Sequence, residues 1–165
     1  MTKPGDKDWL PYAEHVKLLP KKRIASAVLF LNSEGNVLMV KPTYKPSWIL
    51  PGGVTELNES PLEGARREVK EETGLTVSHL QFVAAIHTPR KKENDDVIHF
   101  YFYGGVLSNE QASQITLQAD ELLEYAFVRP DEVSEISTAS FVSHLSKMLV
   151  AIKTKSAIFV ENRES

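Results

Sequence analysis

Residues 53–75, GVTELNESPLEGARREVKEETGL, contain the strongest structural signals in this chain of 165 residues. They predict a helix that begins after Ser60, because serine is a favoured N-cap, Pro61 suits the first helical position and Glu63 completes a capping box. Gly74 is placed to end this helix in a left-handed backbone conformation. We therefore expect one well-bounded helix, preceded by a turn that contains two adjacent glycines.

One side of this helix concentrates negative charge. At about 100° per residue, Gly64 falls in the same arc as Glu68, Glu71 and Glu72. The like-charged pair Glu68 and Glu72, four residues apart, costs a few tenths of a kcal/mol, and the helix dipole disfavours carboxylates in the second half of the helix. Gly64 costs about 0.5–1 kcal/mol relative to alanine, and in this interpretation it leaves space for an ion or a phosphate.

A solvated charged face is the ordinary explanation of such a run, but several small penalties coincide here, which is typical of a functional site. Carboxylates at these spacings suit Mg²⁺ or Mn²⁺ rather than zinc. The helix is therefore a candidate metal site.

The same residues resemble the Nudix box, G-x5-E-x7-R-E-U-x-E-E-x-G-U, in which U is a bulky aliphatic residue. Every specified position is matched, by Gly53, Glu59, Arg67, Glu68, Val69, Glu71, Glu72, Gly74 and Leu75. Residues 48–53, WILPGG, are similar to the segment that usually leads into the box. The resemblance implies an αβα sandwich of the Nudix type, and we expect it to span residues 23–165. Residues 1–22 are polar and mixed, and we expect them to form an extension that packs on this domain.

Outside the box, strands interleaved with two helices indicate a mixed α/β domain with a mixed sheet. The apolar pattern predicts strands at residues 24–31, 37–40, 80–88, 97–107 and 125–128, an edge strand at 158–160, and helices near 12–18 and at 140–153. Four aromatic residues at 100–103 alternate across their strand, so one pair faces the core and the other is a candidate lining for a base pocket.

Composition excludes several classes of protein. The chain has no cysteine, which rules out disulfides, thiolate zinc sites and cysteine catalysis, including the isomerase branch of the Nudix family. A net charge of −3 argues against a nucleic-acid partner. No window approaches about 18 uninterrupted apolar residues, and the N-terminus lacks the layout of a signal peptide. We therefore expect a cytoplasmic protein with no membrane partner.

The resemblance implies hydrolysis of a nucleoside diphosphate linked to another group. The implied ligands of Mg²⁺, with Mn²⁺ as the alternative, are Glu68, Glu72, Glu71 and the carbonyl of Gly52. Arg67 is expected to orient a carboxylate, either Glu59 or Glu71, as an outer-shell partner. The alternative is a non-catalytic Nudix module that senses nucleotides, although such modules generally lose box glutamates and this chain retains them all.

The general base is either a box glutamate or a residue of a later loop. Asp120, Glu121 and Glu124 precede the strand at 125–128, and Glu121 is the preferred candidate; the alternative is that all three are surface charges. The identity of the catalytic base therefore stays open between Glu71 and Glu121.

Candidate substrate-binding residues are Lys41, Tyr44 and Lys45 before the box, and Arg90 after it, although solvated surface is the more ordinary interpretation of each. The substrate itself stays open among oxidised nucleoside triphosphates, ADP-ribose and other sugar nucleotides. The N-terminal segment is also a candidate for homodimer contacts.

Overall fold

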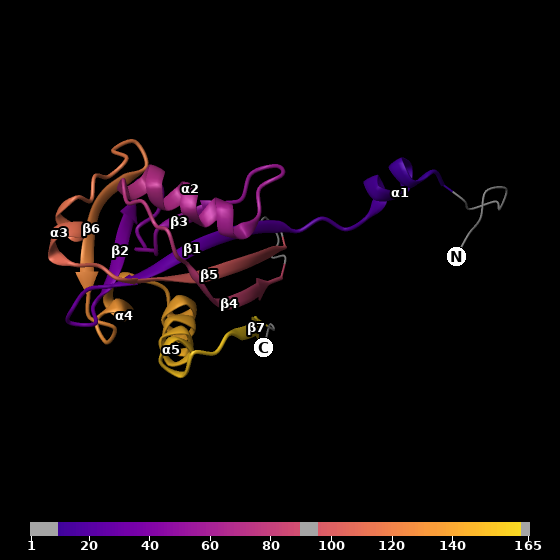
Figure 1. Cartoon of the computed structure of the whole chain (residues 1–165). Coiled ribbons are helices and arrows are strands. Elements are labelled where there is room, and N and C mark those ends of the chain that lie inside the picture. Colours follow the sequence, from indigo (N-terminus) through magenta and orange to yellow (C-terminus); the bar gives the residue numbers. More distant parts are fainter. Residues whose placement is uncertain (1–9, 90–95, 163–165) are drawn as a thin grey trace.

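The computed structural model describes residues 10–89 and 96–162. Within them, a seven-stranded sheet lies between helices α2 and α5 (Figure 1). The strands are β1 (Arg23–Leu31), β2 (Val37–Pro42), β3 (Gly52–Val54), β4 (Gln81–Thr88), β5 (Val97–Val106), β6 (Leu122–Val128) and β7 (Ile158–Glu161). The helices are α1 (Tyr12–Leu18), α2 (Pro61–Thr73), α3 (Asn109–Ser113), α4 (Val133–Ile136) and α5 (Ala139–Thr154). The predicted mixed α/β sandwich is confirmed.

The order of the strands brings the glycine turn beside the middle of the sheet. The main path is β6-β2-β1-β5-β4-β7, and β3 pairs with β1. β5 runs parallel to β1 along its whole length, whereas β2 and β3 are antiparallel to β1. β3 pairs with residues 25–27, so Gly52 and Gly53 lie against the central strand.

Alternation along β1 places its side chains in two cores. Val28 and Phe30 pack with Ala65 and Val69 of α2 on one face of the sheet. Leu29 belongs to the second core, which α5 covers from the opposite face. Because α2 is fixed on its apolar side by the first core, its glutamates are held in one orientation relative to the sheet.

The predicted bounds of α2 are confirmed. The Ser60 hydroxyl accepts a hydrogen bond from the Glu63 N–H at 3.2 Å, and the Glu63 carboxylate accepts one from the Ser60 N–H at 2.8 Å. Gly74 ends the helix with φ of 73°. The short helices α3 and α4 were not indicated by the sequence pattern, because neither is long enough to show a helical period.

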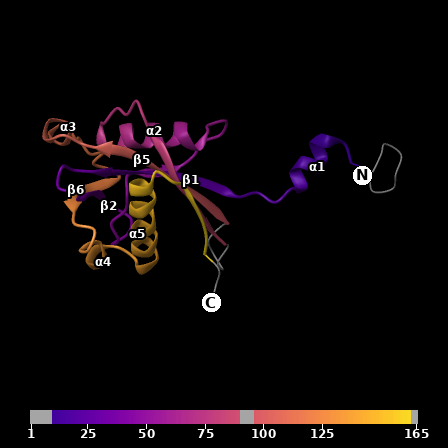
Figure 2. The ribbon, with the colours of Figure 1, turned by 60° about the horizontal axis from the view of Figure 1, so that its bottom comes forward.

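Helix α1 lies away from the sheet in both views of the chain (Figures 1 and 2) and has no buried residue. Packing of residues 1–22 on the domain stays a prediction, because residues 1–9 lie outside the described part of the chain. Pro20 and the exposed Lys21 and Lys22 connect the helix to β1, and Tyr12, Val16 and Leu18 of the helix expose apolar surface. Homodimer contacts through this segment stay a prediction.

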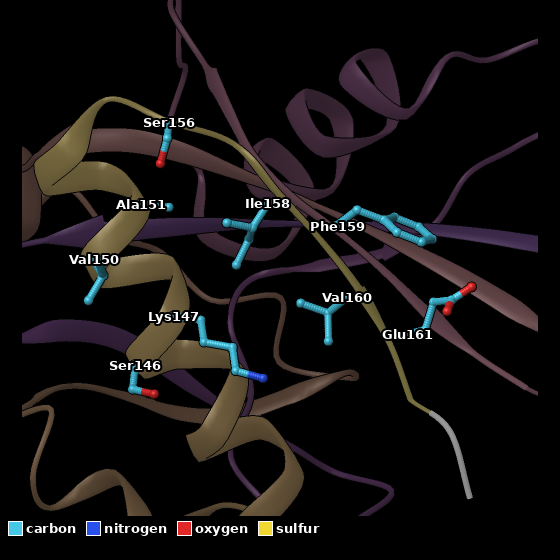
Figure 3. A pocket seen from close by; sticks show the side chains of 9 residues that line it. All are labelled: Ser146, Lys147, Val150, Ala151, Ser156, Ile158, Phe159, Val160 and Glu161. Atoms are coloured by element: carbon cyan, nitrogen blue, oxygen red, sulfur yellow. The ribbon is translucent and has the colours of Figure 1, made fainter.

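A groove of about 580 Å³ separates α5 from β7 (Figure 3). Val150, Ile158 and Val160 contribute apolar side chains to its lining. None of its lining residues belongs to residues 53–75, so this groove is separate from the Nudix-like motif. Among the described residues, no helix combines the length and the apolar character needed to cross a membrane.

The capping boxes at the starts of α2 and α3 provide a matched test of how α2 is held. Ser60→Ala should lower the free energy of unfolding by about 1 kcal/mol, because α2 is locked in the core and loses its N-cap. Ser108 caps α3 with the same geometry, but α3 has five residues and none is buried. Ser108→Ala should therefore cost less, since α3 can fray locally. Urea denaturation of both variants measures the difference, and equal losses would contradict it.

Candidate active site

The two glycines of β3 lie where larger residues do not fit. A Cβ on Gly52 would stand 2.2 Å from the backbone oxygen of Ser26, and the φ of Gly52 is 148°. A Cβ on Gly53 would stand 2.6 Å from the carboxyl group of Glu68. The absence of a side chain at Gly52 lets β3 lie close against β1, and its absence at Gly53 leaves room for the carboxyl group of Glu68 on α2. Gly64, which the sequence pattern placed in one arc with Glu68, is instead buried, and a Cβ there would stand 3.2 Å from Ser26 Oγ.

Glu72 is tied to this turn. Its Oε2 accepts a hydrogen bond of 2.7 Å from the N–H of Gly52, and the residue is 5% exposed. Burial raises the pKa of Glu72 to about 8, against the lowering effect of the Gly52 N–H and with further raising by the negative charge of Glu68. Gly52 thus contacts Glu72 through its N–H, while a role for its carbonyl as a metal ligand stays a prediction.

Arg67 joins the remaining carboxylates. Its Nε and Nη2 donate to the two oxygens of Glu59 at 2.9 and 3.0 Å, as a bidentate pair. Its Nη1 donates to Glu68 at 2.8 Å and to Glu71 at 2.9 Å. The sequence-based expectation was a contact with Glu59 or Glu71, and the guanidinium reaches both and Glu68 as well. These hydrogen bonds, that of Glu59 first, raise the pKa of Arg67 above its ordinary value.

The cluster contains more negative than positive charge. Four carboxylates against one guanidinium leave an excess of three negative charges when all are ionised. Burial raises the pKa of Glu68, although the hydrogen bond from Arg67 opposes that change. A site of hard oxygen donors with uncompensated charge fits a divalent cation such as Mg²⁺. Among the described residues, however, no three acidic, histidine or cysteine side chains are already arranged around one ion position.

Glu121 lies near this cluster. It directly precedes β6, and its carbonyl accepts a hydrogen bond of 2.8 Å from the N–H of Thr43. Its negative charge contributes to the raised pKa of both Glu72 and Glu68. Glu124, the other candidate glutamate of this segment, instead forms an ion pair of 2.9 Å with Lys41.

A cavity of about 330 Å³ opens beside Gly52 and Gly53. Its lining combines small residues of β1, polar aromatic residues of β5 and side chains of the loop between β2 and β3. These residues include Ala25, Ala27, His99, Tyr101, Tyr44 and Lys45. An aromatic-lined space of the size that small-molecule sites have therefore lies beside the two glycines that Glu68 and Glu72 approach.

The aromatic side chains of β5 alternate between the two faces of the sheet, as the sequence pattern predicts. Phe100 and Phe102 belong to the core under α2, whereas Tyr101 lines the cavity. The rings of His99 and Tyr101 are stacked with centroids 6.2 Å apart. Burial lowers the pKa of His99 and raises the pKa of Tyr101 to about 12, so both are neutral, hydrogen-bonding groups at neutral pH.

The candidate substrate-binding residues differ in whether they line this cavity. Tyr44 lines the cavity, and burial, followed by the charges of Glu72 and Glu121, raises its pKa. Lys41 does not line it; its ammonium group pairs with Glu124 and lies 5.9 Å from the ring of Trp48. Arg90 lies outside the described residues. Sequence reasoning missed the cavity role of Ala25 and Ala27, since small residues in a strand carry no chemical signal of their own.

Comparisons with known proteins agree with this geometry. A sequence model of the NUDIX domain matches residues 21–149. The chain is 30% identical over 134 residues to an ADP-ribose pyrophosphatase of Bacillus subtilis strain 168. This alignment covers 73% of this chain and 71% of that protein. It is 28% identical over 116 residues to a MutT-like protein of Streptomyces ambofaciens, covering 70% of each chain. The crystal structure of a MutT protein from Methanosarcina mazei Go1 superposes with a TM-score of 0.67 at 26% identity, covering 82% of this chain and 99% of that one.

The burial of Glu72 predicts how metal-free protein responds to pH. Because the pKa of Glu72 is raised in the folded state from an ordinary value of 4.5 to about 8, its stabilising effect is complete below about pH 4.5 and is lost as the pH rises through 8. Glu72→Gln removes this titration. In the presence of a chelator, the variant should gain stability relative to the native chain between pH 5 and pH 8, by up to a few kcal/mol.

Chemical denaturation at several pH values measures this difference. Glu124→Gln, at an exposed carboxylate, is the matched control and should show no such gain. A difference between Glu72→Gln and the native chain that stays constant across this pH range would contradict the prediction.

Proposed function

The chain belongs to the NUDIX domain family, and from that premise we propose that it is a metal-dependent pyrophosphohydrolase. The substrate class is a nucleoside diphosphate linked to another group. The observation that carries the proposal is the carboxylate cluster around Arg67, placed beside the glycine turn whose two glycines also line an aromatic-lined cavity.

Glu68, Glu71 and Glu72 are the side chains that would hold Mg²⁺, or Mn²⁺ in its place. Such an ion neutralises the charge of a pyrophosphate and lowers the pKa of a water bound to it. Glu72 contributes a carboxylate held by the Gly52 N–H, and Glu68 one held against the Cα of Gly53. Both contacts are made to the backbone of the glycine turn, which does not change rotamer. Both carboxylates are therefore positioned before an ion binds.

Arg67 acts in this proposal as a positioning residue. Its bidentate pair with Glu59 fixes the plane of the guanidinium, and the remaining N–H groups then hold Glu68 and Glu71. A lysine has no planar fork and is not equivalent here. Glu59 thereby supports the metal-binding carboxylates through Arg67.

Glu121 is the proposed general base. It belongs to the segment before β6 rather than to α2, and its charge reaches Glu72 and Glu68. It makes no ion pair among the described residues, in contrast to Glu71, whose carboxylate accepts from Arg67. The absence of such an ion pair is the observation that favours Glu121 over Glu71 as the base in this proposal.

The cavity is proposed to hold the nucleoside part of the substrate. Its stacked His99 and Tyr101 offer an aromatic surface with neutral polar tips, which suits a heterocyclic base. Lys45 lines the cavity, and the charge of Glu72 acts on it, so its ammonium group is a candidate contact for phosphate. The similarity to an ADP-ribose pyrophosphatase makes ADP-ribose the first compound to test, beside a nucleoside triphosphate and a sugar nucleotide.

Glutamine substitutions on α2 test the proposed metal-binding role. Glu72→Gln and Glu71→Gln keep the volume of each side chain and remove its charge, and turnover with Mg²⁺ should fall beyond the 10–100-fold that changes to supporting residues cause. Glu124→Gln is the control and should retain activity. Wild-type turnover in both α2 variants would contradict the proposal. Nucleotide binding without hydrolysis by the native chain would favour the sensing alternative.

Glu121→Gln tests the base separately. If Glu121 accepts the proton, kcat should fall about 10²–10⁴-fold, and the acidic limb of the pH–rate profile should disappear. Asp120→Asn changes the neighbouring carboxylate and should leave both unchanged. An unaltered pH profile in Glu121→Gln would assign the base to another residue, with Glu71 as the next candidate.

A further inference from the structure

An arginine lines the end of the cavity that lies away from the glycine turn. Arg23 is the first residue of β1, and it lines this cavity together with Ala25 and Ala27 of the same strand. The three residues alternate along β1, so their side chains lie on one face of the sheet. Sequence reasoning missed Arg23, because a lone arginine at the start of a strand belongs to no motif.

The pairing of the strands fixes how far Arg23 lies from the turn. Ala27 pairs with Gly52 of β3, and Ala25, two residues earlier in β1, pairs with His99 of β5. Arg23 comes two residues before Ala25, so it lies about 13 Å along the strand from Ala27, at about 3.3 Å per residue. A nucleoside whose sugar lies near the turn can therefore bring the outer edge of its base to Arg23.

The two cationic residues of the cavity serve different ends of it. Burial lowers the pKa of Lys45, and the charge of Glu72 opposes that change, which places Lys45 toward the carboxylates of α2. The charge of Arg23 acts on His99 instead, where it adds to the effect of burial in lowering the pKa. Among the described residues, the guanidinium of Arg23 forms no ion pair and no hydrogen bond, so it is available to a ligand.

A guanidinium distinguishes the edges of heterocyclic bases. It carries five N–H donors and no acceptor. A 6-oxopurine, such as hypoxanthine or guanine, presents the acceptors O6 and N7 side by side, and these match the fork of an arginine. The same edge of adenine presents one acceptor and an amino group, which only donates. A donor-only side chain at this place therefore favours the oxo base.

We propose that Arg23 is a specificity-determining residue that selects nucleotides with a 6-oxopurine base over nucleotides with adenine. The inference rests on the proposed function, in which the cavity holds the nucleoside part of the substrate. His99 lies beside the ring from β5, and the small side chains of Ala25 and Ala27 leave room for it above β1. Within the panel of candidate substrates, Arg23 then shifts preference away from adenine compounds such as ADP-ribose.

Two nucleotides that differ only in the edge of the base test this selection. Isothermal titration calorimetry with Mg²⁺ compares inosine 5′-monophosphate with adenosine 5′-monophosphate. The native chain should bind the inosine nucleotide about 5–10-fold more tightly, because a bidentate arginine contact discriminates between bases by that order. Arg23→Gln should abolish the preference, because a glutamine side chain offers an acceptor as well as donors.

Two further variants separate the fork of the guanidinium from its charge. Arg23→Lys keeps the positive charge but has no planar fork, so it should lose most of the preference. Lys21→Gln removes a positive charge from the exposed connection before β1, outside the cavity, and should leave the preference unchanged. Equal binding of the two nucleotides by the native chain, binding of neither, or an unchanged preference in Arg23→Gln overturns the inference.

A third nucleotide distinguishes a base edge from a second phosphate as the ligand of Arg23. If the guanidinium held a phosphate, adenosine 3′,5′-bisphosphate would bind more tightly than adenosine 5′-monophosphate to the native chain and equally to Arg23→Gln. That result overturns selection by the base edge.

These titrations do not depend on turnover. A chain that prefers the inosine nucleotide through Arg23 and hydrolyses no nucleoside diphosphate derivative would refute the proposed hydrolase and retain the selection. A chain that hydrolyses such derivatives without any preference that depends on Arg23 would do the reverse.

Discussion

The hydrogen bond from the Gly52 N–H to the buried carboxylate of Glu72 is the constraint on which the site depends. It joins the second half of α2 to the strand that pairs with β1, and so fixes the helix against the sheet on its polar side. The apolar side is fixed by the core beneath Ala65 and Val69. Because both sides are held, close approach at Gly53 is required, and Glu68 is positioned along with Glu72.

Besides the Gly52–Glu72 hydrogen bond, Arg67 holds the carboxylates of the site in place. A single guanidinium holds three carboxylates that would otherwise repel one another, and it does so from the exposed edge of the same helix. The repulsion between the negatively charged glutamates of α2 is thus only partly offset by positive charge within the protein. Glu72 has no such partner and takes a raised pKa instead, which leaves the cluster prepared for a positive ligand.

The sequence predicts those structural elements whose ends are defined by residues close together in the chain. Ser60, Pro61, Glu63 and Gly74 define α2 because caps and left-handed turns act over three or four residues. Features set by distant pairing were not predictable. Lys41 meets Glu124 because β2 pairs with β6 in a particular register, and this contact removes Lys41 from the cavity. The orientation of Gly64 depends on which face of α2 meets β1, and a residue-by-residue projection of the helix does not show what lies opposite.

Under the proposed function, in which Glu72 is a ligand of the cation, the raised pKa of Glu72 couples cation uptake to acidity. Near neutral pH this carboxyl group is largely protonated, whereas oxygen coordination requires its anion. Loading of the site therefore expels hydrogen ions into the buffer. The apparent affinity for the cation then becomes steeper with rising pH, and the measured heat of association depends on the ionisation enthalpy of the buffer. A helix placed so tightly against a glycine turn makes the occupancy of its site responsive to the acidity of the surroundings.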